Sequence, residues 1–241
     1  MHQSVYRARF TPVTALDATL RAQMAALYLA HYDGSSPALF AADLAAKDEV
    51  LLLHADGALV GFSTFRLFRR VWQGRPIRVI YSGDTVVERP HWGQQALAFA
   101  WIERMGQLKR QAPELPLYWL LLVKGHRTFR YLPVFGHSFH PHWAEPRPDL
   151  QALADQLAAE LFGTDYQPAC GVVAFNPSRG HLKPEIATPT TEELARGGVR
   201  FFLARNPGYQ QGHELVCLCE MEAHNMKPLT RRLFERGLRD A

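Results

Sequence analysis

The sequence of 241 residues lacks long hydrophobic runs, and its charged residues are not gathered into a block of one sign. No stretch approaches the roughly 18 consecutive apolar residues of a transmembrane helix. Residues 1–12 have no apolar core of a secretory signal peptide. We therefore expect neither membrane association nor secretion, and a cytoplasmic location.

Cysteine is scarce and odd in number, with Cys170, Cys217 and Cys219 as the only three. Cys217 and Cys219 lie two residues apart in an apolar segment, so on a strand both would point to one face. We expect buried, reduced thiols, because Cys-x-Cys is not the usual zinc-finger spacing and other soft ligands are missing nearby.

The 27 basic and 23 acidic residues are interspersed and leave a net charge of only +4. The densest basic segment, from Arg231 to Arg239, alternates with apolar residues at helical spacing, as in a helix with one solvated and one packed face. No aromatic-basic recognition motif accompanies it, so we do not expect a nucleic-acid partner. A hydrophobic content of 47% suffices for a globular core of one large domain or two small ones.

The first half of the chain alternates between strand and helix patterns. In order, the sequence predicts a strand within residues 1–10, helices at 15–31 and 37–46, two strands joined by a turn at Asp56-Gly57, a strand at 77–87, a helix at 94–111 and a strand at 115–123. The last strand is almost continuously apolar and follows a helical crossover, so we expect it to lie parallel to the strand at 77–87.

The second half gives a weaker pattern. We expect a short helix broken near Pro133, a helix capped by Asp149 and ended by Gly163, and a final helix from about Pro228. Strands are expected at CGVVAF (170–175), GVRFFLA (198–204) and HELVCLCEME (213–222).

Residues 79–105 are the most informative segment. A β-branched strand ends near Pro90 and turns through His91-Trp92-Gly93 directly into an amphipathic helix. The first backbone N–H groups of a helix have no internal partner and carry partial positive charge. Such a turn can therefore hold a phosphate without a basic side chain.

Three segments resemble the GNAT superfamily of acyltransferases. They are the hairpin VLLLHADGALVGFSTFRLF (50–68), the turn VVERPHWGQQAL (86–97) and YLPVFG (131–136). The resemblance implies an α/β fold with a twisted mixed sheet flanked by helices. Acyl-CoA would lie where the strand ending near Val87 diverges from the strand starting near Leu117. Residues 1–145 would form the acyl-CoA-binding core, and residues 146–241 a C-terminal α/β extension that completes or lids the same domain.

The resemblance also implies the coenzyme-binding residues. These are Val86, Val87, Trp92, Gly93, Gln94, Gln95, Ala96 and Leu97. The turn departs from the family pattern, because Trp92 replaces a basic or glutamine residue, Gln95 a glycine and Leu97 a small residue. With less glycine, the turn has fewer positive-φ conformations for cradling pyrophosphate. A degenerate, non-catalytic GNAT-fold binding module is therefore the alternative to an enzyme using acetyl-CoA or another acyl-CoA as cosubstrate.

Acyl transfer to an amine needs a base for the amine and an acid for the departing thiolate. Asp84 and Glu88 are the candidate bases, because strand alternation places them on the same side as Ser82 and Val86. Tyr131 is the candidate acid, although it lies five residues before Gly136 where the family has four. The alternatives are solvated carboxylates for Asp84 and Glu88, and a core aromatic for Tyr131.

No cysteine lies where a covalent acyl intermediate would need it, so we expect direct attack in a ternary complex. The partner would be a small-molecule amine, with CoA or an acyl carrier protein as the donor. His137, His140 and His142 are close in sequence, which suggests a metal site, but no carboxylate or thiolate accompanies them. We expect no metal, keep a histidine-site metalloenzyme as a third hypothesis, and note that one of these histidines is an alternative base.

Overall fold

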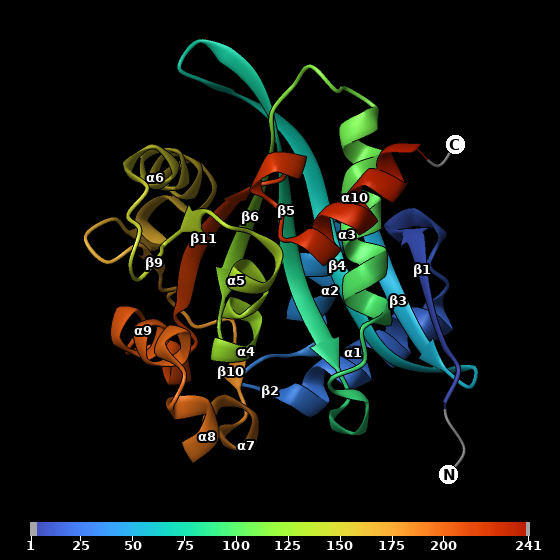
Figure 1. Cartoon of the computed structure of the whole chain (residues 1–241). Coiled ribbons are helices and arrows are strands. Elements are labelled where there is room, and N and C mark those ends of the chain that lie inside the picture. The colour runs from blue at the N-terminus through green and yellow to red at the C-terminus, as the bar shows by residue number, and fades with distance from the viewer. Residues whose placement is uncertain (1–3, 240–241) are drawn as a thin grey trace.

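The computed structural model describes residues 4–239, so the first residues of the strand expected at 1–10 lie outside it. Within that range it contains a nine-stranded mixed sheet with helices on both faces, and a separate sheet of two short strands (Figure 1). The strands are β1 (Tyr6–Pro12), β2 (Tyr32–Asp33), β3 (Glu49–Ala55), β4 (Ala58–Trp72), β5 (Arg75–Val87), β6 (Leu117–Val123), β7 (Phe139–His140), β8 (Tyr166–Gln167), β9 (Val172–Val173), β10 (His181–Leu182) and β11 (Glu214–Glu220). The predicted α/β fold class is confirmed.

Ten α-helices are assigned between residues 4 and 239. They are α1 (Ala18–His31), α2 (Pro37–Ala45), α3 (Ala96–Arg110), α4 (His126–Phe129), α5 (Tyr131–Phe135), α6 (Pro148–Phe162), α7 (Pro184–Ala187), α8 (Thr191–Leu194), α9 (Gly197–Arg205) and α10 (Pro228–Arg239). None of the helices in this part of the chain is both long and apolar enough to cross a membrane.

The strand order is β1-β3-β4-β5-β6-β11-β9-β8, and β7 pairs with β11 beside this path. The pairing of β5 with β6 is parallel, as predicted, and connects through α3. It runs only from Arg78 opposite Leu117 to Ser82 opposite Leu121. Beyond Ser82, β5 stays paired with β4 as far as Val87, whereas β6 stays paired with β11 as far as Val123. The sheet therefore splits into two halves at this end.

Two layers of helices cover the sheet (Figure 1). We call the side packed against α3, α4, α5 and α10 the α3 face, and the side packed against α1, α2 and α6 the α1 face. On β11, Cys217 and Cys219 belong to the α3-face core, while Val216 and Leu218 belong to the α1-face core. Both cysteines are buried and unpaired, as predicted.

A β-bulge in β5 changes the expected alternation. The register with β4 shifts between Ser63 and Phe65, opposite Gly83 and Asp84. Ser82 points to the α3 face, where its Oγ accepts a hydrogen bond from Trp119 Nε1 at 2.9 Å, whereas Val86 packs in the α1-face core. The prediction that Ser82 and Val86 share a side is therefore wrong, because the extra residue reverses the alternation.

Three local predictions also need correction. GVRFFLA forms helix α9 rather than a strand, because Val199 and Phe202 are buried at helical spacing and the Phe202 ring lies 5.9 Å from that of Phe129. Asp149 does not cap α6. Arg147 occupies the N-cap position, and Asp149 lies in the first turn. Of CGVVAF, only the two residues of β9 pair as a strand.

Residues after 146 share the sheet with the earlier part of the chain. β11 lies antiparallel to β6, and α6 packs on the α1 face of both strands. The short strand β10 crosses back to pair with β2, next to α1. The C-terminal segment therefore contributes β8, β9 and β11 to the half of the sheet that contains β6, and it forms part of the wall beside the split.

Candidate active site

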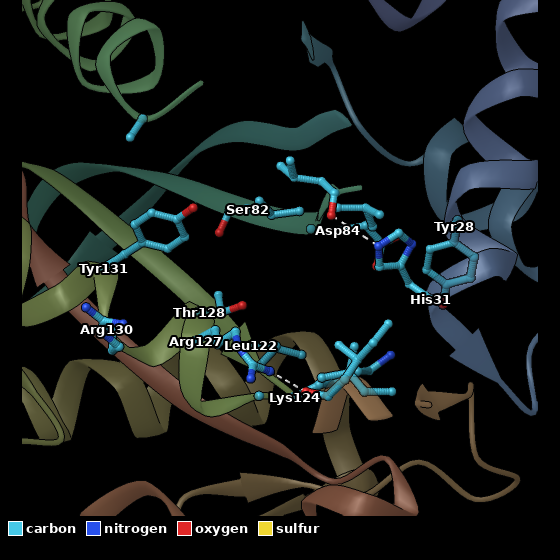
Figure 2. Close-up of a pocket in the computed structure, with 18 of the residues that line it drawn as sticks. Tyr28, His31, Ser82, Asp84, Leu122, Lys124, Arg127, Thr128, Arg130 and Tyr131 are labelled. Atoms are coloured by element: carbon cyan, nitrogen blue, oxygen red, sulfur yellow. Dashed lines mark hydrogen bonds between the residues drawn. The ribbon is translucent and has the colours of Figure 1, made fainter. Parts of the chain in front are cut away.

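A cavity of about 880 Å3 lies at the split between β5 and β6. Its lining includes Phe99 and Leu233 from the α3 face and Tyr28 and Phe40 from the α1 face. The cavity is therefore lined from both faces of the sheet and lies between its two halves. Figure 2 looks into it, with Tyr131 and Ser82 on one side and Tyr28, His31 and Asp84 on the other.

The α1-face wall contains a buried group of charges. Lys124 follows directly after β6, and its Nζ lies 3.4 Å from Glu214 Oε1 at the start of β11. The antiparallel register, with Leu215 opposite Val123, brings these two residues together. The Lys124 side chain is only 12% exposed, and its Nζ also lies 5.2 Å from the centre of the Tyr32 ring.

Burial raises the pKa of Asp84 to about 7, and the neighbouring Asp43 carboxylate acts in the same direction. Lys124 and Lys47 act in the opposite direction but do not offset burial. A carboxyl group with a pKa near neutrality can take up and release protons at physiological pH. Asp84 is therefore well suited to act as a general base.

Lys124 remains a cation in this wall. Burial lowers the pKa of its ammonium, but Glu214 and the other acidic neighbours more than compensate and leave the pKa above its usual range. Burial raises the pKa of Glu214, while Lys124 opposes that rise. This pair fixes one positive and one negative charge beside Asp84.

The α3-face wall carries Tyr131 at the start of α5. Its ring projects toward Ser82 in Figure 2, and its hydroxyl has no hydrogen-bond partner among residues 4–239. Burial raises the pKa of Tyr131, and the nearby Arg130 only partly opposes this. The phenol therefore stays protonated at neutral pH and is available to donate a proton into the cavity.

The N-terminus of α3 opens onto the same cavity. Gly93 has a φ of +87°, and the N-cap residue Gln95 has no side-chain hydrogen bond to the helix. The Gln94 side chain accepts a hydrogen bond from the Leu97 N–H at 3.2 Å. Within the described chain, the N–H groups of Ala96 and Ala98 have no partner, and of these two residues Ala98 lines the cavity. This turn retains free donors for an anion even though it has only one glycine.

Trp92 lies at the mouth of the cavity. Its Nε1 donates a hydrogen bond to the Val87 carbonyl at 2.7 Å, and His31 Nε2 lies 3.1 Å from the same oxygen. The guanidinium of Arg127 lies 4.8 Å from the Trp92 ring centre. Arg127 is held in turn by Glu193 Oε2 at 3.0 Å. Trp92 thus joins the end of β5 to a basic side chain.

Most of the residues predicted for the site line this cavity. They are Asp84, Tyr131, Val86, Val87, Trp92, Gly93, Gln94 and Gln95. Leu97 instead borders a small adjoining pocket beside Tyr131 and Trp119, and Ala96 borders neither space. Glu88 does not line the cavity. Its side chain is 45% exposed and lies 3.9 Å from His91.

Sequence reasoning missed Lys124, Glu214, Arg127, Arg130 and Arg179, all of which line the cavity. A signal was available for two of them. Lys124 ends one strongly apolar segment and Glu214 begins another, and a charge at the edge of a buried strand needs a partner. Only the pairing of β6 with β11 identifies that partner.

The three clustered histidines do not converge on one point. His142 Nδ1 accepts hydrogen bonds from the N–H groups of Ala144 and Glu145, whereas His140 is buried on β7. Burial lowers the pKa of His140 to about 4. Residues 4–239 contain no group of three histidine, cysteine or acidic residues arranged to hold a metal ion.

No protein-family model and no curated protein matches this sequence. Similar solved structures include a probable N-acyltransferase of unknown function from Enterococcus faecalis, with 12% identity and a TM-score of 0.42 over 56% of this chain and 33% of that chain. Another is a GNAT-family N-acetyltransferase from Escherichia coli in complex with CoA, with 17% identity and a TM-score of 0.37 over 54% and 71%. A third is described as a bacterial toxin, with 13% identity and a TM-score of 0.40 over 60% and 86%.

The chain spans about a third of the length of the first of these proteins. GNAT-family enzymes are thus among the structural neighbours, as the resemblance in sequence led us to expect. At these low identities and TM-scores, the chemistry of the neighbours is not transferred to this chain. We therefore argue the chemistry of the cavity from the residues that line it.

Proposed function

We propose that the protein transfers an acyl group, acetyl by default, from a CoA thioester to a small-molecule amine. The observation that carries the proposal is the arrangement across the split sheet. A proton donor, Tyr131, lies on the α3 face, and a carboxyl group with a pKa of about 7, Asp84, lies on the α1 face. A thioester lying between the two halves of the sheet would meet both groups.

The donor enters from the α3 face in this proposal. The free N–H groups at the start of α3 and the basic side chains of Arg127 and Arg130 suit the phosphates of a coenzyme. The narrow space between β5 and β6 suits an extended pantetheine arm. Gln94 would exchange its hydrogen bond with Leu97 for contact with the ligand.

The amine enters from the α1 face and loses a proton to the Asp84 carboxylate. The acceptor, bound as an ammonium ion, thereby becomes a neutral amine, and Asp84 passes this first proton to water. The lone pair of the amine then attacks the thioester carbon, a C–N bond forms, the carbonyl oxygen takes up negative charge and the nitrogen gives its second proton to the Asp84 carboxylate. When the C–S bond breaks, the Tyr131 hydroxyl donates its proton to the departing sulfur. Water then reprotonates the phenolate and takes the proton from Asp84, and the products are an amide and a free thiol.

Glu88 has no part in this mechanism, because it lies outside the cavity. Residues 146–241 do have a part, since Glu214 and Arg179 belong to the α1-face wall. We propose that residues 1–145 contain the acyl-CoA-binding core and both catalytic groups, and that residues 146–241 complete the same domain.

A non-catalytic binding module remains the second candidate, favoured by the replacement of a turn glycine by Gln95 and of a small residue by Leu97. The φ of Gln95 is −105°, however, so this position does not require glycine. A raised pKa at Asp84 is also costly to stability and serves no evident purpose in a protein that only binds.

The test is thiol release from acetyl-CoA in the presence of a panel of primary amines, with the amide identified by mass spectrometry. We expect amine-dependent release that Asp84→Asn abolishes and Glu88→Gln preserves. A parallel assay with an acetylated acyl carrier protein determines which carrier the cleft accepts. Stabilisation by CoA without turnover of any amine would favour the binding module, and equal losses in both variants would refute the role of Asp84.

A further inference from the structure

Most charges that line the α1-face side of the cavity are already paired. Lys124 is bound to Glu214, and Asp43 is bound to Lys47 at 2.5 Å. Arg179 is the exception, because residues 4–239 offer its guanidinium no carboxylate within ion-pair distance. The carboxyl group of Asp84 likewise has no hydrogen-bond partner in the described chain. The cavity thus presents one unpaired guanidinium on the same side as its candidate base.

Arg179 is held in place without an anion. Its guanidinium carbon lies 4.0 Å from the centre of the Phe175 ring, a cation–π contact that leaves the edge of the guanidinium free for hydrogen bonds. The following residue, Gly180, has a φ of +105° and packs against Ser35, and β10 then pairs with β2. The residues that follow Arg179 are therefore anchored to the α1 side of the cavity.

The other unpaired cations of the cavity belong to the opposite side. Arg130 precedes Tyr131 in the chain, and Lys227 immediately precedes α10. Both lie toward the α3 face, where the proposed mechanism places the coenzyme. Arg179, an exposed side chain that also lines the cavity, is therefore the cation available to bind an anion on the acceptor side.

We infer that the acceptor is an amine that also carries an oxyanion, a carboxylate or a phosphate, and that Arg179 binds this group. The inference rests on the proposed function. A simple alkylammonium ion would leave the guanidinium of Arg179 without a partner and would add a second positive charge beside it, whereas Lys124 is already neutralised by Glu214. In a zwitterionic acceptor, the oxyanion pairs with Arg179 while the ammonium group faces Asp84. Arg179 is a specificity residue in this account, since it touches the substrate away from the reacting atoms.

The experiment compares acceptors that share a two-carbon amine skeleton: ethanolamine, glycine and O-phosphoethanolamine. Phenethylamine and L-phenylalanine form a second, larger pair. Thiol release from acetyl-CoA is measured for the wild type, Arg179→Gln, Arg179→Lys and Arg69→Gln, whose arginine is exposed on β4 away from the cavity.

We expect an acid-bearing member of a series to react with a kcat/KM at least tenfold above that of its counterpart without an acidic group. Arg179→Gln should raise KM for that acceptor about ten- to hundredfold, the range for hydrogen bonds to a charged group, with little change in kcat. Arg179→Lys should recover part of this loss, and Arg69→Gln should match the wild type. Preference for glycine or for O-phosphoethanolamine identifies the oxyanion as carboxylate or phosphate.

The inference is overturned if amines without an acidic group react as well as their acid-bearing counterparts. It is also overturned if Arg179→Gln leaves the KM for the acid-bearing acceptor unchanged. Either result keeps the acyltransferase proposal intact. If no amine in either series promotes thiol release while the protein remains folded by circular dichroism, the proposed function itself fails, and with it the inference.

Discussion

Replacing Asp84 with asparagine should make the protein more stable and inactive at the same time. Asparagine has nearly the shape of a protonated aspartic acid but cannot ionise. The folded protein holds the pKa of Asp84 at about 7, compared with 3.8 for the free side chain. Between these two values, the unfolded chain has already lost the proton that the folded protein keeps. Ionisation therefore favours unfolding, and the wild type loses stability as pH rises through this window.

The size of the effect follows from the difference of about 3 pKa units. At about 1.4 kcal/mol per unit, the full cost at pH 8 is up to about 4 kcal/mol. Asp84→Asn should therefore exceed the wild type in free energy of unfolding at pH 8 by a few kcal/mol. The advantage should shrink steadily toward pH 4, where both proteins carry a neutral side chain.

Urea denaturation of both proteins at several pH values between 4.5 and 8 measures this difference. Under the same conditions, loss of the base should lower kcat for acyl transfer by about 10²- to 10⁴-fold. In the wild type, log kcat/KM should rise with pH and level off above about 7. A stability difference that stays constant across this range, or a variant less stable at pH 8, would refute the reasoning about Asp84.

Five further changes test separate parts of the account. Asp43→Asn removes a neighbour that raises the pKa of Asp84, so the acid limb of the pH–rate profile should move below 7; a shift upward would contradict this. Tyr131→Phe should lower kcat about 10²-fold while calorimetry finds unchanged affinity for acyl-CoA, and an unaltered kcat would remove Tyr131 from the mechanism. Gly93→Ala should lower the free energy of unfolding, measured with denaturant, by about 1–2 kcal/mol, because a residue with a Cβ is strained at a φ of +87°. No atom lies within 4 Å of the added Cβ, so no steric clash adds to this cost. Gln95→Gly should leave coenzyme affinity unchanged, since Gln95 has a negative φ. Glu214→Gln leaves Lys124 buried without its partner and should destabilise the fold by about 3–5 kcal/mol, so a neutral result in thermal denaturation would show that the pair is unimportant.

The elements around the split could be predicted from the sequence because their signals are local. Ser36 accepts a hydrogen bond from Leu39 N and Pro37 opens α2, as the N-cap pattern indicates. The continuous apolar run of β6 gave its burial on both faces and its parallel pairing with β5. Asp84 was selected from strand alternation and Tyr131 from the resemblance to the GNAT superfamily, and both line the cavity.

The remaining features depend on contacts between distant segments. Lys124 and Glu214 lie 90 positions apart, and only the register of β6 with β11 joins them. The bulge at Gly83 and Asp84 has no pattern of its own in the sequence, so simple alternation misplaced Ser82. In α9, aromatic and β-branched residues favoured a strand, but packing of Phe202 against Phe129 stabilises a helix instead.

The most direct test of the central claim is a crystal structure of the protein with a non-reactive acyl-CoA analogue, such as one with a ketone in place of the thioester. We expect the pantetheine arm between β5 and β6, the phosphates at the start of α3, the sulfur-equivalent atom facing Tyr131 and the carbonyl carbon accessible from Asp84. An analogue bound elsewhere on the molecule, or no binding at millimolar concentration with the split between the strands filled by protein side chains, would contradict the account.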